Sequence, residues 1–247
     1  MTELSVFGEE GYKEKAILLS GKIGADYIEE NADDEKLVLK VSEAGLSLCK
    51  DKMELRADLC EMLPRLKQSN LEKEMLVKAF KIKGKKNLRI IDATAGFGED
   101  SIILAAAGHE MTMFEYNPII YELLSDAIER AKEDTRLESI VSRMHLFNKN
   151  SVDAMREYAK EEAEYDAILL DPMFPKRQKS ASVKKKFQII HNIEAPCSTE
   201  EELLEAALSL KVKKVVVKRP SKGEFLAGKK PDYSVEGKAV RYDVFIK

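Results

Sequence analysis

Short apolar runs alternate with amphipathic segments along the chain from about residue 88 onward. Runs with the length and composition of buried strands occupy residues 88–92, 111–115, 143–147, 165–170 and 214–218. Between these runs apolar positions recur at helical spacing, most clearly after Asn117 and Pro118, where six apolar side chains share one face. Because strands that alternate with helices form βαβ units, the pattern predicts an α/β protein with a parallel sheet.

Capping residues mark the predicted helix ends. Asn117 and Pro118 supply an N-cap and a first-turn proline, Ser151 is placed to cap the helix after the third strand, and residues 198–201 have the pattern of a capping box. Gly108 can end the helix predicted for residues 99–107.

The C-terminal segment has the alternation of a strand at residues 239–246. Gly237 stands where a hairpin turn would join it to a short strand around Tyr233. We therefore expect an antiparallel pair at one edge of the parallel sheet.

The N-terminal segment has a pattern of its own. Residues 37–41 and 46–49 flank the turn sequence Glu43-Ala44-Gly45 and predict a hairpin, and residues 71–82 predict a connecting helix. We expect a small N-terminal α+β subdomain, residues 1–70, and a Rossmann-like domain, residues 71–247.

Composition narrows the classes of protein. The chain has 247 residues, 44% of them hydrophobic, which is enough for a full core. It has no apolar run of about 20 residues and no basic-then-apolar start, so we expect a cytoplasmic protein without a membrane partner. Three cysteines without CxxC spacing and three scattered histidines predict no metal site.

A glycine turn follows the first strand of the predicted sheet. Asp92, Gly96 and Gly98 lie between that strand and a helix, where missing side chains let a ligand approach the backbone and the helix N-terminus. Close packing of the strand on the helix is the alternative explanation for the two glycines.

Acidic residues around this turn favour one kind of ligand. Glu115 ends the next strand, at about the interval at which an acidic side chain meets ribose hydroxyls in adenosine-binding sites. Glu99 and Asp100 begin the helix, where they would repel a pyrophosphate but suit a sulfonium and an ammonium group. S-Adenosylmethionine is therefore favoured over NAD, although Glu99 and Asp100 also stabilise a helix N-terminus by themselves.

The most informative motif follows the fourth strand. Asp171, Pro172 and Phe174 stand where open α/β sheets bind ligands, although Asp-Pro can also simply begin a turn. The Asp171 carboxylate and the Pro172 carbonyl could accept the N–H groups of a base amine, whose lone pair is otherwise delocalised into the ring. Phe174 could stack on an extruded base. The motif therefore predicts methylation of an exocyclic amine.

A basic segment follows this motif in a chain whose net charge is −3. No acidic residue occurs between residues 172 and 192, which suits a polyanion, whereas a solvated loop is the alternative. The predicted RNA contacts are Lys176, Arg177, Lys179, Lys184, Lys185 and Lys186, with Lys218 and Arg219 at the end of the fifth strand.

These motifs, DATAGFGED, FEYNP, LLDPMFPKRQKSASVKKK and VVVKRP, resemble in order and spacing those of the RsmJ-type ribosomal RNA small subunit methyltransferases. The resemblance implies a class I S-adenosylmethionine-dependent fold and methylation of guanine N2 in 16S ribosomal RNA or the small ribosomal subunit. It also implies cofactor contacts from Glu99, Asp100, Glu115, Tyr116, Asn150, Ser151 and Asp171.

Other readings of the same residues are a DNA, other-RNA or small-molecule amine methyltransferase and a non-catalytic Rossmann module that binds RNA or a nicotinamide cofactor. Competition between RNA and DNA substrates distinguishes the first group. The cofactor that raises the melting temperature distinguishes the second.

Overall fold

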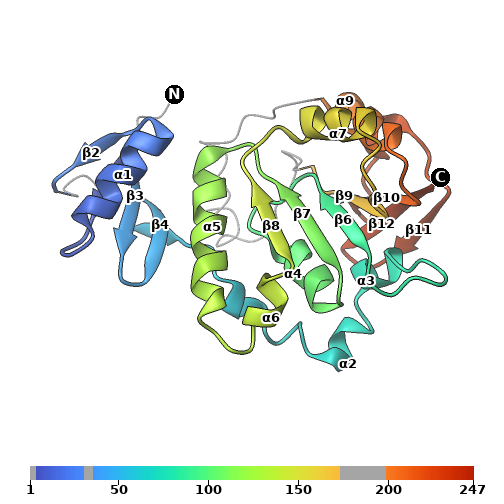
Figure 1. Ribbon diagram of the computed structural model, residues 1–247, viewed down its shortest axis with the longest axis horizontal. Helices are drawn as coiled ribbons and strands as arrows, with labels where there is room; N and C mark the ends of the chain where they lie inside the picture. The colour runs from blue at the N-terminus through green and yellow to red at the C-terminus, as the bar shows by residue number, and fades with distance from the viewer. Residues whose placement is uncertain (1–3, 31–35, 173–198) are drawn as a thin grey trace. The chain divides into compact units, whose positions relative to one another are not determined.

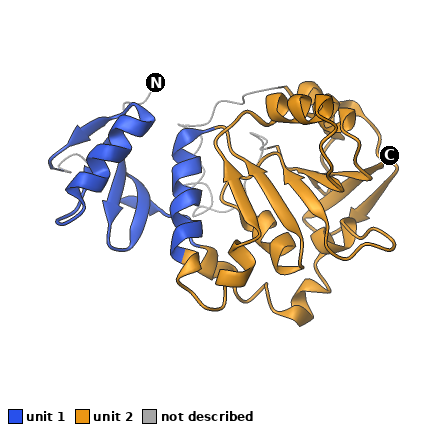
Figure 2. Cartoon of the chain, viewed as in Figure 1, with its two compact units in different colours: residues 1–58, 117–130, 175–195 blue, residues 59–116, 131–174, 196–247 orange. Residues whose placement is uncertain are grey.

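The computed structural model describes residues 4–30, 36–172 and 199–247. They fall into two compact units (Figure 2). Unit 1 comprises residues 1–58, 117–130 and 175–195, and unit 2 comprises the rest of the chain. The division at residue 70 expected from the sequence stays a prediction.

Unit 2 is built on a seven-stranded sheet with the order β11-β12-β10-β9-β6-β7-β8 (Figure 1). Neighbouring strands from β8 to β10 run parallel, whereas β12 runs antiparallel to both β10 and β11. The α/β fold class and the antiparallel edge pair are thus confirmed. The strands are β6 Arg89–Asp92, β7 Glu110–Phe114, β8 Met144–Phe147, β9 Ala167–Leu170, β10 Lys214–Pro220, β11 Tyr233–Glu236 and β12 Val240–Ile246.

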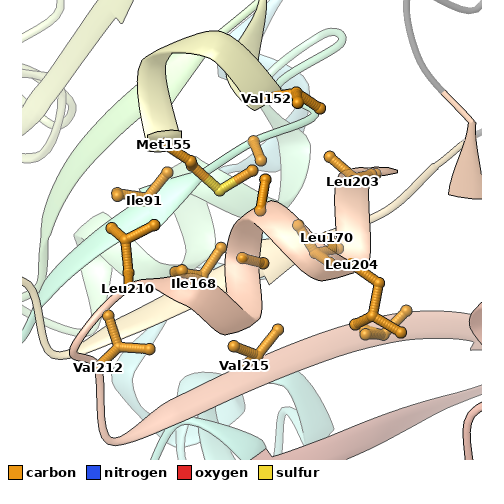
Figure 3. Close-up of a cluster of buried hydrophobic side chains, with 14 of the residues drawn as sticks. Ile91, Val152, Met155, Ile168, Leu170, Leu203, Leu204, Leu210, Val212 and Val215 are labelled. Carbon is orange, nitrogen blue, oxygen red and sulfur yellow. The ribbon is translucent and has the colours of Figure 1, made fainter. Parts of the chain in front are cut away.

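One hydrophobic core cluster of unit 2 lies between this sheet and the helices α7 and α9. Apolar residues of β6, β9 and β10, such as Ile91, Ile168 and Val215, pack with Met155 of α7 and Leu204 of α9 (Figure 3). Each side chain is nearly inaccessible to water, and burial of a side chain of this size contributes about 1.5 to 3 kcal/mol. This packing holds the parallel strands in register.

Unit 2 contains both α-helices and short 3-10 helices, labelled η. They are η1 Leu59–Met62, α2 Gln68–Leu71, α3 Met75–Ala79, α4 Glu99–Ala106, α6 Glu138–Val141, α7 Ser151–Lys160, α9 Glu200–Ser209 and η2 Leu226–Gly228. No helix among the described residues is long and apolar enough to cross a membrane.

Three helix predictions differ from the structure. The helix predicted for residues 71–82 is replaced by α2 and α3, because Glu74 has an extended backbone and is held by a bidentate contact with Arg65. Asn150, rather than Ser151, caps α7, since its side chain accepts from the backbone N–H groups of Val152 and Asp153. The capping box of α9 is formed by Thr199 and Glu202 and not within residues 198–201.

Unit 1 contains a five-stranded sheet with the order β2-β1-β3-β4-β5. The predicted hairpin is confirmed as the antiparallel pair β3–β4, and β1 pairs in parallel with β2 and β3. In the α5 helix, Asn117 caps the N-terminus as predicted, and Asp126 accepts from the backbone N–H of Leu46 at 2.9 Å. The elements are β1 Leu4–Gly8, α1 Lys13–Ile23, β2 Asp26–Ile28, β3 Leu37–Ser42, β4 Gly45–Lys50, β5 Met53–Leu55 and α5 Pro118–Lys132.

Candidate active site

The carboxyl ends of three parallel strands meet at the turn that follows β6. Backbone N–H groups of Ala93 and Ala95 donate to the carbonyls of Leu169 at the end of β9 and Phe114 at the end of β7, both at 3.0 Å. The strand order reverses direction between β6 and β9, which is the position where open α/β sheets bind ligands. The predicted cofactor turn and the predicted catalytic motif therefore lie at one place in unit 2.

The glycines of this turn are required by backbone conformation. Gly96 and Gly98 have φ angles of 53° and 74°, in the left-handed region, and Gly98 is the N-cap of α4. A Cβ built at Gly96 would meet only the Thr94 carbonyl oxygen, at 4.0 Å. Crowding is thus not the reason for glycine at position 96, and its α-carbon leaves room for a ligand to approach.

Asp92 holds the turn from inside. Its carboxylate is 2% exposed and accepts from the Ser101 hydroxyl at 2.6 Å and from the Thr94 backbone N–H at 3.0 Å. Burial raises the pKa of Asp92 to about 7, despite these two hydrogen bonds. The structure therefore shows Asp92 in a role that shapes the turn, and a direct cofactor contact stays a prediction.

The Glu115 carboxylate lies beside the glycine turn, as the sequence spacing predicted. It accepts from the Gly96 backbone N–H at 3.0 Å. The next residue, Tyr116, is 53% exposed, so its ring is available to a ligand. Asn148 was missed by the sequence analysis: its side-chain amide donates to the carbonyls of Glu115 and Tyr116 and so fixes the backbone there.

Asn150 and Ser151 follow β8 at the same edge of the sheet. The Asn150 side-chain oxygen caps α7, and Ser151 is buried. Their expected cofactor contacts stay predictions.

Asp171 lies against the glycine turn, and its charge is balanced by a lysine. Its backbone N–H donates to the Thr94 hydroxyl at 2.7 Å, and its carboxylate lies 2.9 Å from Nζ of Lys218. Lys218 also donates to Asp100 of α4 at 2.6 Å. Burial raises the pKa of Asp171, whereas the Lys218 ammonium opposes that rise.

Lys218 and Arg219, which the sequence predicted to contact RNA, contact groups of the protein itself in the structure. Lys218 is held between two carboxylates, and Arg219 is only 5% exposed. The Arg219 guanidinium donates to the Glu224 carbonyl and contacts Glu200. Neither side chain forms part of an exposed basic surface, because nearby carboxylate or carbonyl groups bind the ammonium of Lys218 and the guanidinium of Arg219.

The remaining predicted residues divide between exposed positions and positions outside the described part of the chain. Glu99 is exposed at the start of α4, and Pro172 is half-buried directly after Asp171. Phe174, Lys176, Arg177, Lys179, Lys184, Lys185 and Lys186 lie outside the described residues. Within the described residues no group of His, Cys, Asp and Glu side chains could hold a metal ion.

The sheet order and the site define a class I S-adenosylmethionine-dependent methyltransferase. The SAM_MT model, which describes SAM-dependent methyltransferases, matches residues 25–247. A SAM-dependent methyltransferase of known structure from Neisseria gonorrhoeae is 27% identical, with a TM-score of 0.75 over 98% of this chain and 95% of its own.

Curated relatives of this chain are named "Ribosomal RNA small subunit methyltransferase J". The relative from Thioalkalivibrio sulfidiphilus is 36% identical over 99% of this chain and 98% of its own length. The relative from Pseudomonas aeruginosa is 39% identical over 87% of this chain and 85% of its own length. The chain therefore belongs to the family of ribosomal RNA small subunit methyltransferase J, as the sequence motifs indicated, and its cofactor is S-adenosylmethionine.

The residues of this site fit that cofactor. The open side of Gly96 allows a ligand to approach the backbone, and the carboxylates of Glu115, Asp100 and Asp171 give the site a negative character that suits a sulfonium and an ammonium group. Membership of an enzyme family also removes the basis for the non-catalytic module considered from the sequence.

The raised pKa of Asp92 predicts a specific dependence of stability on pH. Folding favours the protonated form, so this contribution is present below pH 4 and is lost as the pH rises through about 7. Relative to Asp92→Asn, the wild-type free energy of unfolding should fall by roughly 4 kcal/mol between pH 4 and pH 8. Urea denaturation of both proteins at a series of pH values measures this difference. Parallel pH curves for the two proteins would contradict the prediction.

Proposed function

We propose that this protein transfers the methyl group of S-adenosylmethionine to the exocyclic N2 of a guanine in 16S ribosomal RNA. The observation that carries the proposal is the position of Asp171 and Pro172, which the Thr94 hydroxyl anchors beside the cofactor turn. The names of the relatives support small-subunit ribosomal RNA as the substrate. A ribosomal substrate is also the reason to propose a cytoplasmic location.

The acceptor amine needs groups that bind its N–H bonds. Its lone pair is delocalised into the base, so it is a weak nucleophile until the nitrogen becomes pyramidal. The Asp171 carboxylate and the Pro172 carbonyl are adjacent acceptors for the two N–H groups, and Asp171 can also take the proton that the nitrogen loses. S-Adenosylmethionine, when bound, would supply the electrophilic methyl group that this nitrogen attacks.

The proposed reaction also requires that the protein extrude the target base and bind the RNA phosphates. A base must leave its stack to reach Asp171, which costs a few kcal/mol, and stacking on Phe174 would return about 1 to 3 kcal/mol. The lysine and arginine residues between 176 and 186 are proposed to contact the phosphates. Assembled or nearly assembled small subunits are the proposed form of the substrate.

Methyl transfer itself tests the proposal. The purified protein is incubated with tritiated S-adenosylmethionine and small subunits from cells that lack the homologous enzyme, and the labelled nucleoside is identified after digestion. We expect label on guanine N2. Absence of transfer, or label on another atom such as adenine N6, would show that the proposed substrate is wrong.

Asp171→Asn should separate catalysis from binding. The amide keeps the size of the side chain but cannot take up the amine proton, so kcat should fall by about 10²- to 10⁴-fold. Cofactor affinity measured by calorimetry should change only modestly, and the melting temperature serves as the control for folding. Unchanged turnover would remove Asp171 from the mechanism.

Reversing the charges of Lys184, Lys185 and Lys186 to glutamate should weaken RNA binding. The slope of log affinity against log salt should become shallower by about two, because each phosphate contact on single-stranded nucleic acid contributes roughly 0.7. Cofactor affinity should not change. Lys229→Glu with Lys230→Glu reverses two exposed lysines elsewhere and is the control. An unaltered slope in the first variant would mean that these lysines do not contact phosphates.

A further inference from the structure

Lys218 connects the two acidic residues of the site. Its Nζ lies 2.6 Å from Oδ2 of Asp100 and 2.9 Å from Oδ2 of Asp171. These partners come from different elements, because Asp100 belongs to the first turn of α4 and Asp171 follows β9. The side chains of Lys218 and Asp100 are 24% and 13% exposed, so this ion pair is largely shielded from solvent, whereas the Asp171 side chain is 36% exposed and remains partly open to a ligand.

The sheet register places Lys218 beside Asp171. The parallel strands β9 and β10 pair through Leu170 and Val217, and the two charged residues each follow directly after this pair. On its other side Lys218 pairs with Tyr242 of β12, at a backbone position inside the sheet. The lysine is therefore held by strand pairing as well as by its ion pairs, unlike a residue on a surface loop.

The charges around Asp171 act in opposite directions. Burial raises the pKa of Asp171, Asp100 raises it further, and Lys218 lowers it. Burial by itself would lower the pKa of Lys218, but the two carboxylates outweigh burial and raise it. The charged and titratable groups that face Asp171 are Asp92 of β6, Asp100 of α4, Lys218 and Arg219 of β10, and Tyr242 of β12.

Asp171 must be ionised to accept the N–H groups and the proton of the amine. A protonated Asp171 would offer a hydrogen-bond donor and could not take the proton that nitrogen releases. In the proposed reaction the nitrogen–methyl bond forms as the methyl–sulfur bond breaks, the electron pair of that bond stays on sulfur, and the amine proton passes to Asp171. Nothing in this balance requires Lys218 to lose its own proton.

We propose that Lys218 is a positioning residue for the methyl-transfer step, whose ammonium group, shared with Asp100, keeps the Asp171 carboxylate charged and fixed in orientation. This role rests on the proposed function, in which Asp171 accepts an N–H group and the proton of the target amine. It replaces the contact with RNA phosphate that the sequence suggested for Lys218. Asp100 is then the anchor that fixes the lysine.

The charge of Asp171 is tested directly by a pH titration of its ¹³C-labelled carboxylate in the cofactor-free protein, with the resonance assigned from Asp171→Asn. Lys218→Met should raise the pKa of Asp171 by about one to three units, because an adjacent cation lowers a carboxylate pKa by that amount. Asp100→Asn should lower it, since a neighbouring negative charge is removed. These opposite shifts are the central expectation.

Lys214→Met is the matched control. Lys214 begins the same strand, and its ammonium donates to the Ala79 and Lys81 carbonyls and to the Tyr233 hydroxyl, away from Asp171. Its replacement should leave the Asp171 titration where it is. If Lys218→Met does not fold, Lys218→Gln, which keeps a polar side chain without the charge, takes its place. An Asp171 pKa that does not rise in a folded Lys218→Met, or does not fall in Asp100→Asn, would overturn the proposal.

Activity gives a second, independent readout. In Lys218→Met the acid limb of the pH profile of kcat/KM should move upward by the same one to three units, roughly, and Lys218→Arg should restore it. A changed salt dependence of RNA binding with an unmoved acid limb would instead assign Lys218 to phosphate contact and overturn the proposal. The carboxylate titration needs no RNA, so a wrong substrate assignment would not be mistaken for failure of the Lys218 role.

Discussion

The buried carboxylate of Asp92 is the interaction on which both halves of the site depend. One of its oxygens accepts from Ser101 in α4 and the other from the backbone of Thr94 in the turn. The Thr94 hydroxyl in turn accepts from the backbone N–H of Asp171. A series of hydrogen bonds through Asp92 and Thr94 therefore joins the helix that follows the cofactor turn to the residue proposed to bind the amine. The relative position of the glycine turn and Asp171 is thus set by backbone and buried groups, and in the proposed reaction this matters because an in-line displacement depends strongly on alignment.

Burial of several carboxyl groups is unfavourable while they are charged. Protonation of Asp92 and the ion pairs of Lys218 reduce this cost. Asp92 is uncharged over much of the acidic pH range because burial raises its pKa to about 7. Asp171 and Asp100 share the ammonium of Lys218. A site that accepts a cationic cofactor thus uses one carboxyl group as a structural tie and places an internal cation between two others. Removing one partner of such a network would leave a charge uncompensated, so each member constrains the others.

The sequence predicted the elements of unit 2 well where periodicity and buried apolar runs decide the outcome. All five predicted parallel strands are present, with ends shifted by one or two residues. The partners of individual side chains were harder to predict, because they depend on contacts between segments that are distant in the sequence. Nothing local distinguishes Lys218 from a phosphate-binding lysine until β10 is placed beside β9, and Asn148 has no role until β8 is paired with β7. The Arg65–Glu74 contact that separates α2 from α3 is equally invisible to helical periodicity.

The charges of the site also bear on how RNA would reach it. Glu99, Asp100, Glu115 and Asp171 gather around the turn and would repel phosphate groups, which favours a cationic cofactor but not a polyanion. Lys218 offsets one of these negative charges, so the group as a whole keeps a net negative charge. Under the proposed function the attraction for RNA comes from other basic residues, and residues 176–186 carry the highest local density of positive charge in the sequence. In the proposed function, a base extruded from its stack reaches the carboxylates while the lysines of this segment contact its phosphates. Such a separation of charge would let one protein with a net charge of −3 bind both a cationic cofactor and RNA.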